Sequence, residues 1–231
     1  IFLFLSSATY TWRCWFIHQS SCNKMIKLWV RTSSVNVQKV AWSLLELKLD
    51  YQQVVVGGIH GGTDSIEYLK LNPTGKVTTI QDNEFNIWES HTILRYLWSK
   101  YGEIAVDSQE WYVRDQWMDF TNVNVMPHFI QLFWQEVRLP RVQRDPTKAS
   151  FHKTELEKAL LFVEQRLQNK QWLNGKSFGP ADIALGSLME RTADLTDVLV
   201  KFDHLHSWVS NLRSRRPYVQ IIMTDYDELR G

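Results

Sequence analysis

The sequence predicts an α/β domain followed by an all-α domain. Strand-type and helix-type patterns alternate from Met25 to Gly102, whereas only helix-type patterns follow Glu103. A length of 231 residues is comfortable for two domains, and 44% apolar with 22% charged residues is an ordinary globular composition. We therefore expect domain limits of 25–103 and 104–231.

The segment 1–24 fits neither domain. It has no initiating Met and no basic stretch, and its apolar run IFLFL is too short to cross a bilayer. We predict a non-native or disordered extension, with a signal peptide as the alternative. Both cysteines, Cys14 and Cys22, lie here, so a cysteine nucleophile, a thiolate metal site or a redox pair is excluded from the rest of the chain. No metal site is predicted.

The first domain opens with a strand at 26–30, a helix at 36–47 and a strand at 51–56. The helix carries an apolar stripe at the 3.6-residue period, and strand-helix-strand over about 30 residues predicts a parallel pair. A glycine-rich loop at 57–62 follows, and it contains neither of the usual nucleotide-binding glycine signatures. A short helix at 64–71 comes next.

Residues 72–102 predict a hairpin that leads into a helix. The strands are expected at 76–80 and 85–88, with a polar reversal at 81–84 and a helix from Ser90 that ends at a left-handed Gly102. The complete order, β-α-β-α-β-β-α, is that of a thioredoxin-like domain.

The start of that last helix is a candidate binding site. A helix N-terminus offers unpaired N–H groups and a partial positive charge, and here Glu89 adds a carboxylate and Ser90 a hydroxyl. This mixture suits the zwitterionic α-amino acid group of a ligand. The plain alternative is that Ser90 only caps the helix.

The second domain shows helix patterns alone. A capping box at Asp107 and Glu110 precedes a long segment at 109–136 that is interrupted at Pro127. Further helices are expected from Pro146, from Pro180 and over 203–212, and Asp182 is expected to bond back to the amide of the Gly179 cap. The tail at 224–231 is polar and expected to be mobile.

The charges nearly cancel, with 26 basic and 25 acidic residues and a formal net charge of +1. The chain therefore has no overall field to attract nucleic acid or an anionic membrane, and neither partner is predicted.

Several short motifs in both domains resemble the cytosolic glutathione transferases, in particular bacterial serine-type members close to the theta, delta and phi classes. Singly these motifs are weak, but together they follow the predicted elements in order and at the family's spacings. They are Ile26-Lys27-Leu28-Trp29, Ser34-Val35-Asn36-Val37-Gln38-Lys39-Val40, Asn72-Pro73-Thr74-Gly75-Lys76-Val77, Trp88-Glu89-Ser90-His91, Ile93-Leu94-Arg95-Tyr96-Leu97 and Ala181-Asp182-Ile183-Ala184-Leu185-Gly186.

This resemblance implies a cytoplasmic, homodimeric detoxification enzyme that conjugates glutathione, as co-substrate, to a hydrophobic electrophile without a bound cofactor. Two alternatives stay open: a non-catalytic binding module on the same fold, and a glutathione-dependent isomerase or peroxidase.

The resemblance also implies the site residues. Ser34 matches the hydroxyl that acts on the thiol, although it equally suits an N-cap, and Thr32, Ser33 and Asn36 share its loop. The remaining positions bind glutathione: Glu89 and Ser90 hold the γ-glutamyl end, the Val77 backbone pairs with the cysteinyl part, and Lys76 and His60 are candidates for the glycyl carboxylate.

Thr78 stands where the family has a cis proline, next to the glutathione-binding backbone. The sequence leaves open whether the Val77–Thr78 peptide is cis or trans, and a non-proline cis bond costs ~2.5–4 kcal/mol. For the electrophile pocket, the candidates are Trp111, Tyr112 and Trp117, with core packing as the alternative for at least two of them.

Overall fold

The computed structural model describes residues 25–103, 105 and 107–231. The predicted extension at 1–24, with both cysteines, lies outside the described residues. Four strands form one mixed sheet in the order β2-β1-β3-β4. Strands β1 and β2 are parallel, whereas β3 pairs antiparallel with both β1 and β4. The strands are β1 (Ile26–Val30), β2 (Tyr51–Val55), β3 (Thr79–Asp82) and β4 (Phe85–Trp88).

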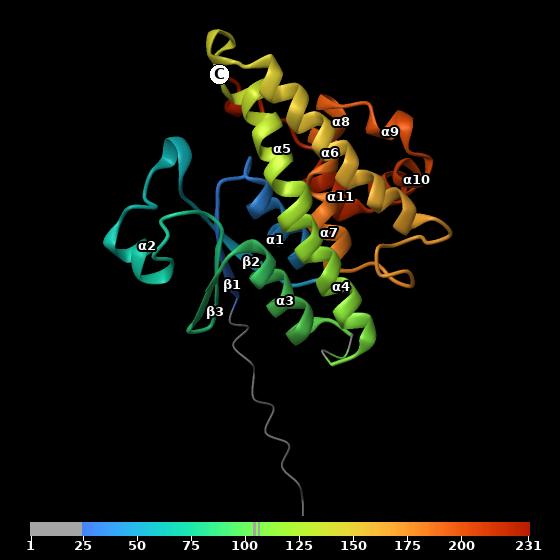
Figure 1. Cartoon of the computed structure of the whole chain (residues 1–231). Coiled ribbons are helices and arrows are strands. Elements are labelled where there is room, and N and C mark those ends of the chain that lie inside the picture. Colours follow the sequence, from blue (N-terminus) through green and yellow to red (C-terminus); the bar gives the residue numbers. More distant parts are fainter. Residues whose placement is uncertain (1–24, 104, 106) are drawn as a thin grey trace, which may run out of the picture.

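Helices cover both faces of this sheet. Helices α1 (Val35–Glu46) and α3 (Ser90–Tyr101) pack together on one side, and α2 (Ile66–Leu71) lies on the other (Figure 1). A core of buried aliphatic side chains from β1, α1, β3 and α3 joins the layers. The predicted α/β order is therefore confirmed, and the apolar stripes of α1 and α3 face the sheet.

The second half of the described chain is helical and packs beside α1 and α3 (Figure 1). The predicted fold class, α/β followed by all-α, is confirmed. The helices are α4 (Gln109–Phe120), α5 (Met126–Phe133), α6 (Pro146–Leu167), α7 (Pro180–Gly186), α8 (Met189–Leu195), α9 (Val198–Lys201), α10 (Asp203–Arg213) and α11 (Arg216–Ile221).

Strand β3 begins later than predicted, at Thr79 instead of position 76. The carbonyl of Lys76 accepts hydrogen bonds from Tyr68 Oη (2.7 Å) and Asn72 Nδ2 (2.8 Å). Side-chain donors, not a neighbouring strand, therefore satisfy the Lys76 carbonyl, and the chain joins the sheet only after Thr78. The reversal is correspondingly shorter, because Gln81 and Asp82 belong to β3.

The predicted left-handed cap at Gly102 is wrong. Gly102 has φ −85° and ψ 168°, an extended conformation that any residue adopts. A Cβ at this position would lie 2.4 Å from the carbonyl oxygen of Trp98. Glycine is required by the close approach of the helix backbone, not by the sign of φ.

The helices predicted for the second half begin at the expected residues, except that the cap of α4 is one residue later than expected. Ser108, not Asp107, caps α4, and its Oγ accepts from Trp111 N at 3.1 Å. The predicted interruption near Pro127 appears as a wider π-helical turn, Thr121–Val125, between α4 and α5. Pro127 then lies in the first turn of α5, where no backbone N–H is needed.

Asp182 bonds back to its cap as predicted, with Gly179 N donating to its Oδ2 at 3.0 Å. Its Oδ1 accepts from Leu173 N (3.0 Å) and from Trp208 Nε1 (2.9 Å). The cap is a glycine because a Cβ at 179 would lie 2.9 Å from the Arg114 guanidinium carbon. This buried carboxylate therefore ties α7, α10 and the loop before α7 together.

The C-terminal tail contradicts the sequence-based expectation of a mobile segment. Tyr226 and Leu229 are buried, at 8% and 9% exposed. Tyr226 Oη donates to Asp194 at 2.7 Å, and Gly231 N donates to Val137 O at 3.0 Å. Figure 1 shows the C-terminus beside the far end of α5. Burial of these two side chains, together with the two hydrogen bonds, anchors the tail to the helical half of the protein. The sequence patterns also did not predict α11, which precedes the tail.

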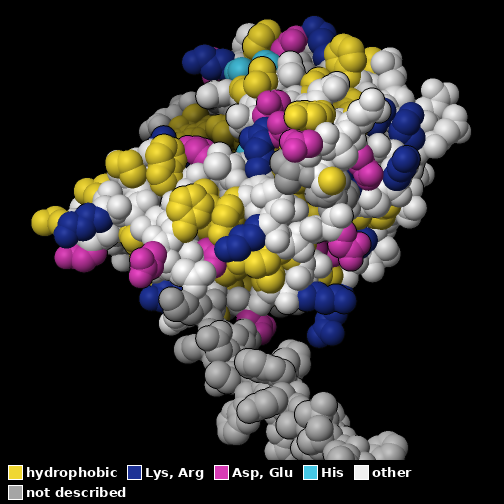
Figure 2. Space-filling view, turned by 90° about the horizontal axis from the view of Figure 1, so that it is seen from below, with side chains coloured by type: hydrophobic (Ala, Val, Ile, Leu, Met, Phe, Trp, Pro, Cys, Tyr) yellow, Lys and Arg dark blue, Asp and Glu magenta, His cyan; other side chains and the backbone are white. Residues whose placement is uncertain are grey.

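Within the described residues, no helix combines the length and the apolar character that crossing a membrane requires. On the face shown in Figure 2, basic and acidic side chains are interspersed, in keeping with the near-zero net charge.

Candidate functional site

A cavity of about 300 Å³ opens at the carboxyl end of β1. It brings together three of the predicted site residues, Ser34, Lys76 and Val77, and adds Asn36. The remaining lining comes from Arg31, Gly57, Gly58, Thr63 and Gly75. Strand ends are where backbone and side-chain polar groups are free to meet a ligand, and this cavity collects loops from three of them.

Ser34 occupies the N-cap position of α1, but its hydroxyl makes no cap hydrogen bond. The backbone alone holds the residue, with Ser34 N donating to Arg31 O at 2.9 Å. The two neighbouring hydroxyls differ: Thr32 is exposed, and Ser33 Oγ is buried without a partner among the described residues. Ser34 therefore lines the cavity, and its hydroxyl is not occupied as a helix cap.

The helical half of the protein fixes this loop. The buried Arg191 of α8 donates from Nη2 to Ser33 O at 2.8 Å and to Gln38 Oε1 at 3.3 Å. Burial lowers the pKa of Arg191 to about 10, so it is charged at neutral pH. A charged hydrogen bond to a carbonyl is among the stronger ones in proteins. The helical half of the chain thus anchors the residue next to Ser34 and the first turns of α1.

Asn36 connects the Ser34 loop to the start of α3. Its Oδ1 accepts from Ser90 Oγ at 3.2 Å and from Lys39 Nζ at 3.1 Å. With the oxygen so engaged, the amide nitrogen of Asn36 is left for the cavity. The sequence placed Asn36 among the polar residues of the loop after the first strand, and nothing near it in the sequence indicated a hydrogen bond to the start of α3.

Glu89 lies immediately before α3 with an exposed side chain and a backbone φ of 69°. Positive φ is uncommon outside glycine, and residues held there cost ~1–3 kcal/mol and cluster at binding and catalytic sites. Glu89 is the N-cap residue of α3, and the buried Ser90 follows it, but the Glu89 side chain makes no cap hydrogen bond. Neither Glu89 nor Ser90 lines the cavity at Ser34.

The Val77–Thr78 peptide is cis, one of the two geometries that the sequence left open. Thr78 is buried, and its Oγ1 donates to Trp29 O at 3.3 Å. Lys76 is exposed at the rim of the first cavity. His60 is also exposed but lines a neighbouring cavity instead.

Behind the site, Lys39 is 1% exposed, and its Nζ lies 3.3 Å from His91 Nε2. Neither side chain forms an ion pair among the described residues. Burial lowers the pKa of Lys39 to about 7, opposed by the charge of Glu89. Burial and then the charges of Lys39 and Arg95 lower the pKa of His91 to about 2, so the imidazole is neutral. A titratable amine thus lies directly under Asn36.

Replacing Lys39 by methionine is expected to stabilise the protein by about 1–4 kcal/mol at pH 6. The folded pKa is below the ordinary value of 10.5, so the cost of burying the charge is complete below about pH 7 and disappears as the pH rises toward 10.5. Urea unfolding of both proteins at pH 6 and pH 9 measures the difference. The stabilisation should shrink at pH 9, whereas Lys70→Met on the exposed face of α2 should show neither effect; a pH-independent difference contradicts the expectation.

The three aromatic residues proposed for the electrophile lie elsewhere. Trp111 is buried, Tyr112 is exposed, and Trp117 packs edge-on against Phe120, 5.1 Å between ring centres. None of them lines the cavity at Ser34 or the one beside it. Helix periodicity placed them on α4 but not on the face that meets the site.

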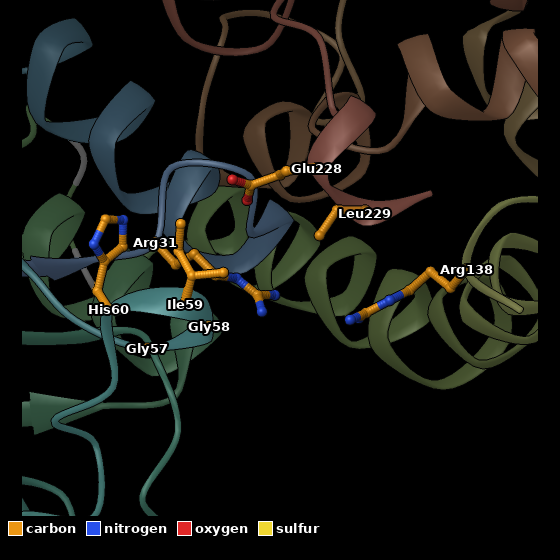
Figure 3. Close-up of a pocket in the computed structure, with 8 residues that line it drawn as sticks. All are labelled: Arg31, Gly57, Gly58, Ile59, His60, Arg138, Glu228 and Leu229. Atoms are coloured by element: carbon orange, nitrogen blue, oxygen red, sulfur yellow. The ribbon is translucent and has the colours of Figure 1, made fainter. Parts of the chain in front are cut away.

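The neighbouring cavity, of about 220 Å³, shares Arg31, Gly57 and Gly58 with the first. Its other walls are Ile59, His60, Arg138, Glu228 and Leu229 (Figure 3). It therefore lies between the glycine-rich loop and the C-terminal tail, next to Ser34.

Among residues 25–103, 105 and 107–231, no group of three His, Cys, Asp or Glu side chains is arranged to hold a metal ion.

Two family models match the chain. The model described as glutathione S-transferase, N-terminal domain, covers residues 28–105, and the one described as glutathione S-transferase, C-terminal domain, covers residues 125–216.

Individual relatives agree with these models. Glutathione S-transferase GstB of Escherichia coli K12 is 29% identical over 204 residues, which is 86% of this chain and 98% of that protein. A crystal structure of the theta class glutathione S-transferase from Xanthomonas axonopodis pv. citri with glutathione bound is 33% identical, with a TM-score of 0.80 over 87% of this chain and 99% of that one. Glutathione transferase URE2P6 of Phanerochaete chrysosporium, in complex with oxidized glutathione, is 26% identical, with a TM-score of 0.79 over 86% and 94% of the two chains.

Proposed function

This chain belongs to the glutathione S-transferase family, and we propose that it conjugates glutathione to electrophilic small molecules at the cavity beside Ser34. The observation that carries the proposal is Ser34, which lines the cavity at the start of α1 and whose hydroxyl is not used as a helix cap. Glutathione is a co-substrate, and the reaction needs no resident cofactor.

The chemistry depends on forming the thiolate. A free thiol has a pKa near ~8.5, and the thiolate is the attacking species. A hydroxyl that donates to the sulfur, beside the partial positive charge of a helix N-terminus, lowers that pKa. The thiolate then forms a C–S bond as the leaving group departs with the bonding electrons, and the thiol proton passes to solvent. Ser34 is the catalytic residue in this proposal.

Glutathione would lie along the strand ends with its amino-acid group at α3. Glu89 would accept hydrogen bonds from the α-amino group, and Ser90 with the N-terminus of α3 would bind the α-carboxylate. The backbone of Val77, followed by Thr78, would pair with the cysteinyl part. Lys76, which lines the first cavity, would bind the glycyl carboxylate. His60 is the second candidate for this carboxylate, but it lines the neighbouring cavity.

The quaternary state and location follow the family in this proposal: a cytoplasmic homodimer that detoxifies hydrophobic electrophiles, with domain limits of 25–103 and 104–231. Strand β4 supports dimer formation, because it is an outer strand of the sheet and exposes Phe85 and Trp88. Exposed aromatic residues on a sheet edge are typical of protein contacts.

Retention on immobilised glutathione, together with turnover of a halogenated nitroaromatic, tests the function. Glu89→Gln should raise KM for glutathione about tenfold or more, because a hydrogen bond to a charged group is worth ~1.5–3 kcal/mol. Glu84→Gln, an exposed change in the hairpin turn, should leave both measurements unaltered. A folded protein that neither binds nor turns over would end the enzyme proposal, and unchanged KM in the Glu89 variant would move the amino-group contact elsewhere.

A further inference from the structure

The second cavity is lined by two arginines and adjoins the cavity at Ser34. Arg31 follows β1 directly, three residues before Ser34, and Arg138 ends the π-helical segment Trp134–Arg138 after α5. Figure 3 shows their guanidinium groups pointing toward one another across the cavity. The N-terminal and C-terminal halves of the chain thus supply one cation each.

Neither arginine is neutralised by an ion pair among the described residues. The Arg31 Nε is buried without a hydrogen-bond partner, and Arg138 stacks over the Trp134 ring at 4.6 Å. Burial lowers the pKa of Arg31, and the charge of Arg138 lowers it further. Two half-buried guanidinium groups without a carboxylate partner in the described part of the chain repel one another, so this arrangement favours an anion that enters between them.

The other ionisable groups leave the cavity cationic. Glu228 faces it from the tail and partly offsets Arg31, but lies too far to form an ion pair. His60 is exposed at the opposite wall. Arg191 lies behind Arg31 and adds positive charge, although its own hydrogen bonds go to Ser33 and Gln38.

The glycine-rich loop shapes the cavity around Arg31. A Cβ at Gly58 would lie 2.9 Å from Arg31 Cδ, so the loop backbone packs directly on the arginine stem. Ile59 and Leu229 supply apolar contacts at the rim. The cavity is therefore suited to an amphiphilic group with an apolar body and a negative end.

We propose that the second cavity binds the electrophile through an anionic substituent, a carboxylate or sulfonate, held between Arg31 and Arg138. This inference rests on the proposed function and specifies the substrate class. In the reaction, the glutathione thiolate attacks the carbon that bears the leaving group, the C–S bond forms, the bond to the halide breaks, and the halide leaves with the electron pair. The two arginines hold the substituent and take no part in bond making.

The test compares chlorodinitrobenzoate with its uncharged primary amide, each rate divided by the uncatalysed rate with glutathione. The wild-type enzyme should prefer the carboxylate by about tenfold or more in kcat/KM, since a charged hydrogen bond is worth ~1.5–3 kcal/mol. Arg138→Gln should remove most of this preference and leave the amide rate within about twofold, because Arg138 lines the second cavity and not the first. Arg31→Gln should also remove most of the preference. Arg31→Lys, which keeps the charge, should retain part of it.

Arg141→Gln is the matched control, because Arg141 is an exposed arginine of the next turn that does not line the cavity. Equal wild-type rates for the acid and the amide overturn the inference while leaving the transferase function intact. If the arginine variants instead raise KM for glutathione and slow both electrophiles equally, the anion in the cavity is the glycyl carboxylate of glutathione and the inference is wrong. Absence of turnover with both electrophiles defeats the proposed function itself.

Discussion

Replacing Ser34 by alanine is expected to lower kcat/KM about tenfold to a hundredfold at neutral pH, with KM for glutathione changed less than about twofold. A hydrogen bond to a charged atom is worth ~1.5–3 kcal/mol, and one pKa unit corresponds to about 1.4 kcal/mol. Loss of the hydroxyl should therefore raise the pKa of the bound thiol by about 1–2 units. The pH dependence of kcat/KM measures that shift directly.

The adjacent serine provides the control for this experiment. Ser33 has a buried hydroxyl with no partner among the described residues, and it does not line the first cavity. Ser33→Ala should retain wild-type turnover and the same pH profile. If Ser34→Ala keeps full activity and Asn36→Ala loses it, the amide of Asn36 is the group that acts on sulfur. A rate loss with no movement of the pH profile would contradict thiol activation by Ser34.

Replacing Asp182 by alanine is expected to lower the free energy of unfolding by about 3–5 kcal/mol. The substitution leaves three buried donors, Leu173 N, Gly179 N and Trp208 Nε1, without their acceptor. The charge of Arg114 would also lose its nearby carboxylate. For a chain of this size, thermal unfolding should shift down by roughly 6–20 °C. Asp203→Ala, at the exposed start of α10, should shift it by little.

The pH dependence of the free energy of unfolding separates the contribution of the buried Asp182 charge from that of its hydrogen bonds. Burial raises the pKa of Asp182 from 3.8 to about 6, although three hydrogen bonds oppose the shift. The folded state then binds more protons between about pH 4 and pH 6, so the carboxyl's contribution to stability falls as the pH rises through that window. The stability deficit of Asp182→Asn relative to wild type should narrow over the same range. A constant deficit from pH 4 to pH 7 would mean that Asp182 titrates normally.

Local patterns predicted most elements because their causes are local. The hairpin and α3 follow from two strand-like runs around a polar reversal, predicted over 81–84, and from an apolar helical stripe. The start of α7 follows from Pro180 and Asp182. The errors have equally specific causes. Side chains of Tyr68 and Asn72 took the backbone hydrogen bonds of Lys76, and two apolar residues docked a tail that looked polar.

Some residues of the candidate site could likewise be placed from the sequence, and others could not. Val77 and Lys76 come just before β3, and Glu89 and Ser90 come just after its hairpin partner β4, so the predicted hairpin already placed the two pairs at the same end of the sheet. The aromatic candidates on α4 line neither cavity, and they stay a prediction, because a helix period gives the buried face only to within a turn. The alternatives for Ser34 were also beyond local reasoning, since cap and ligand-facing serines share the same sequence context.

The sequence by itself determined the α/β-then-helical order, the motifs of the glutathione S-transferase family and the hydroxyl-rich loop after β1. Only the tertiary structure decided that Ser34 and not Ser33 lines the cavity, that Lys39 is buried under Asn36, and that Arg31 and Arg138 line one cavity. The physical reason is range: backbone propensity and burial period are encoded within a few residues, whereas the charge and shape of a cavity depend on segments brought together from distant parts of the chain.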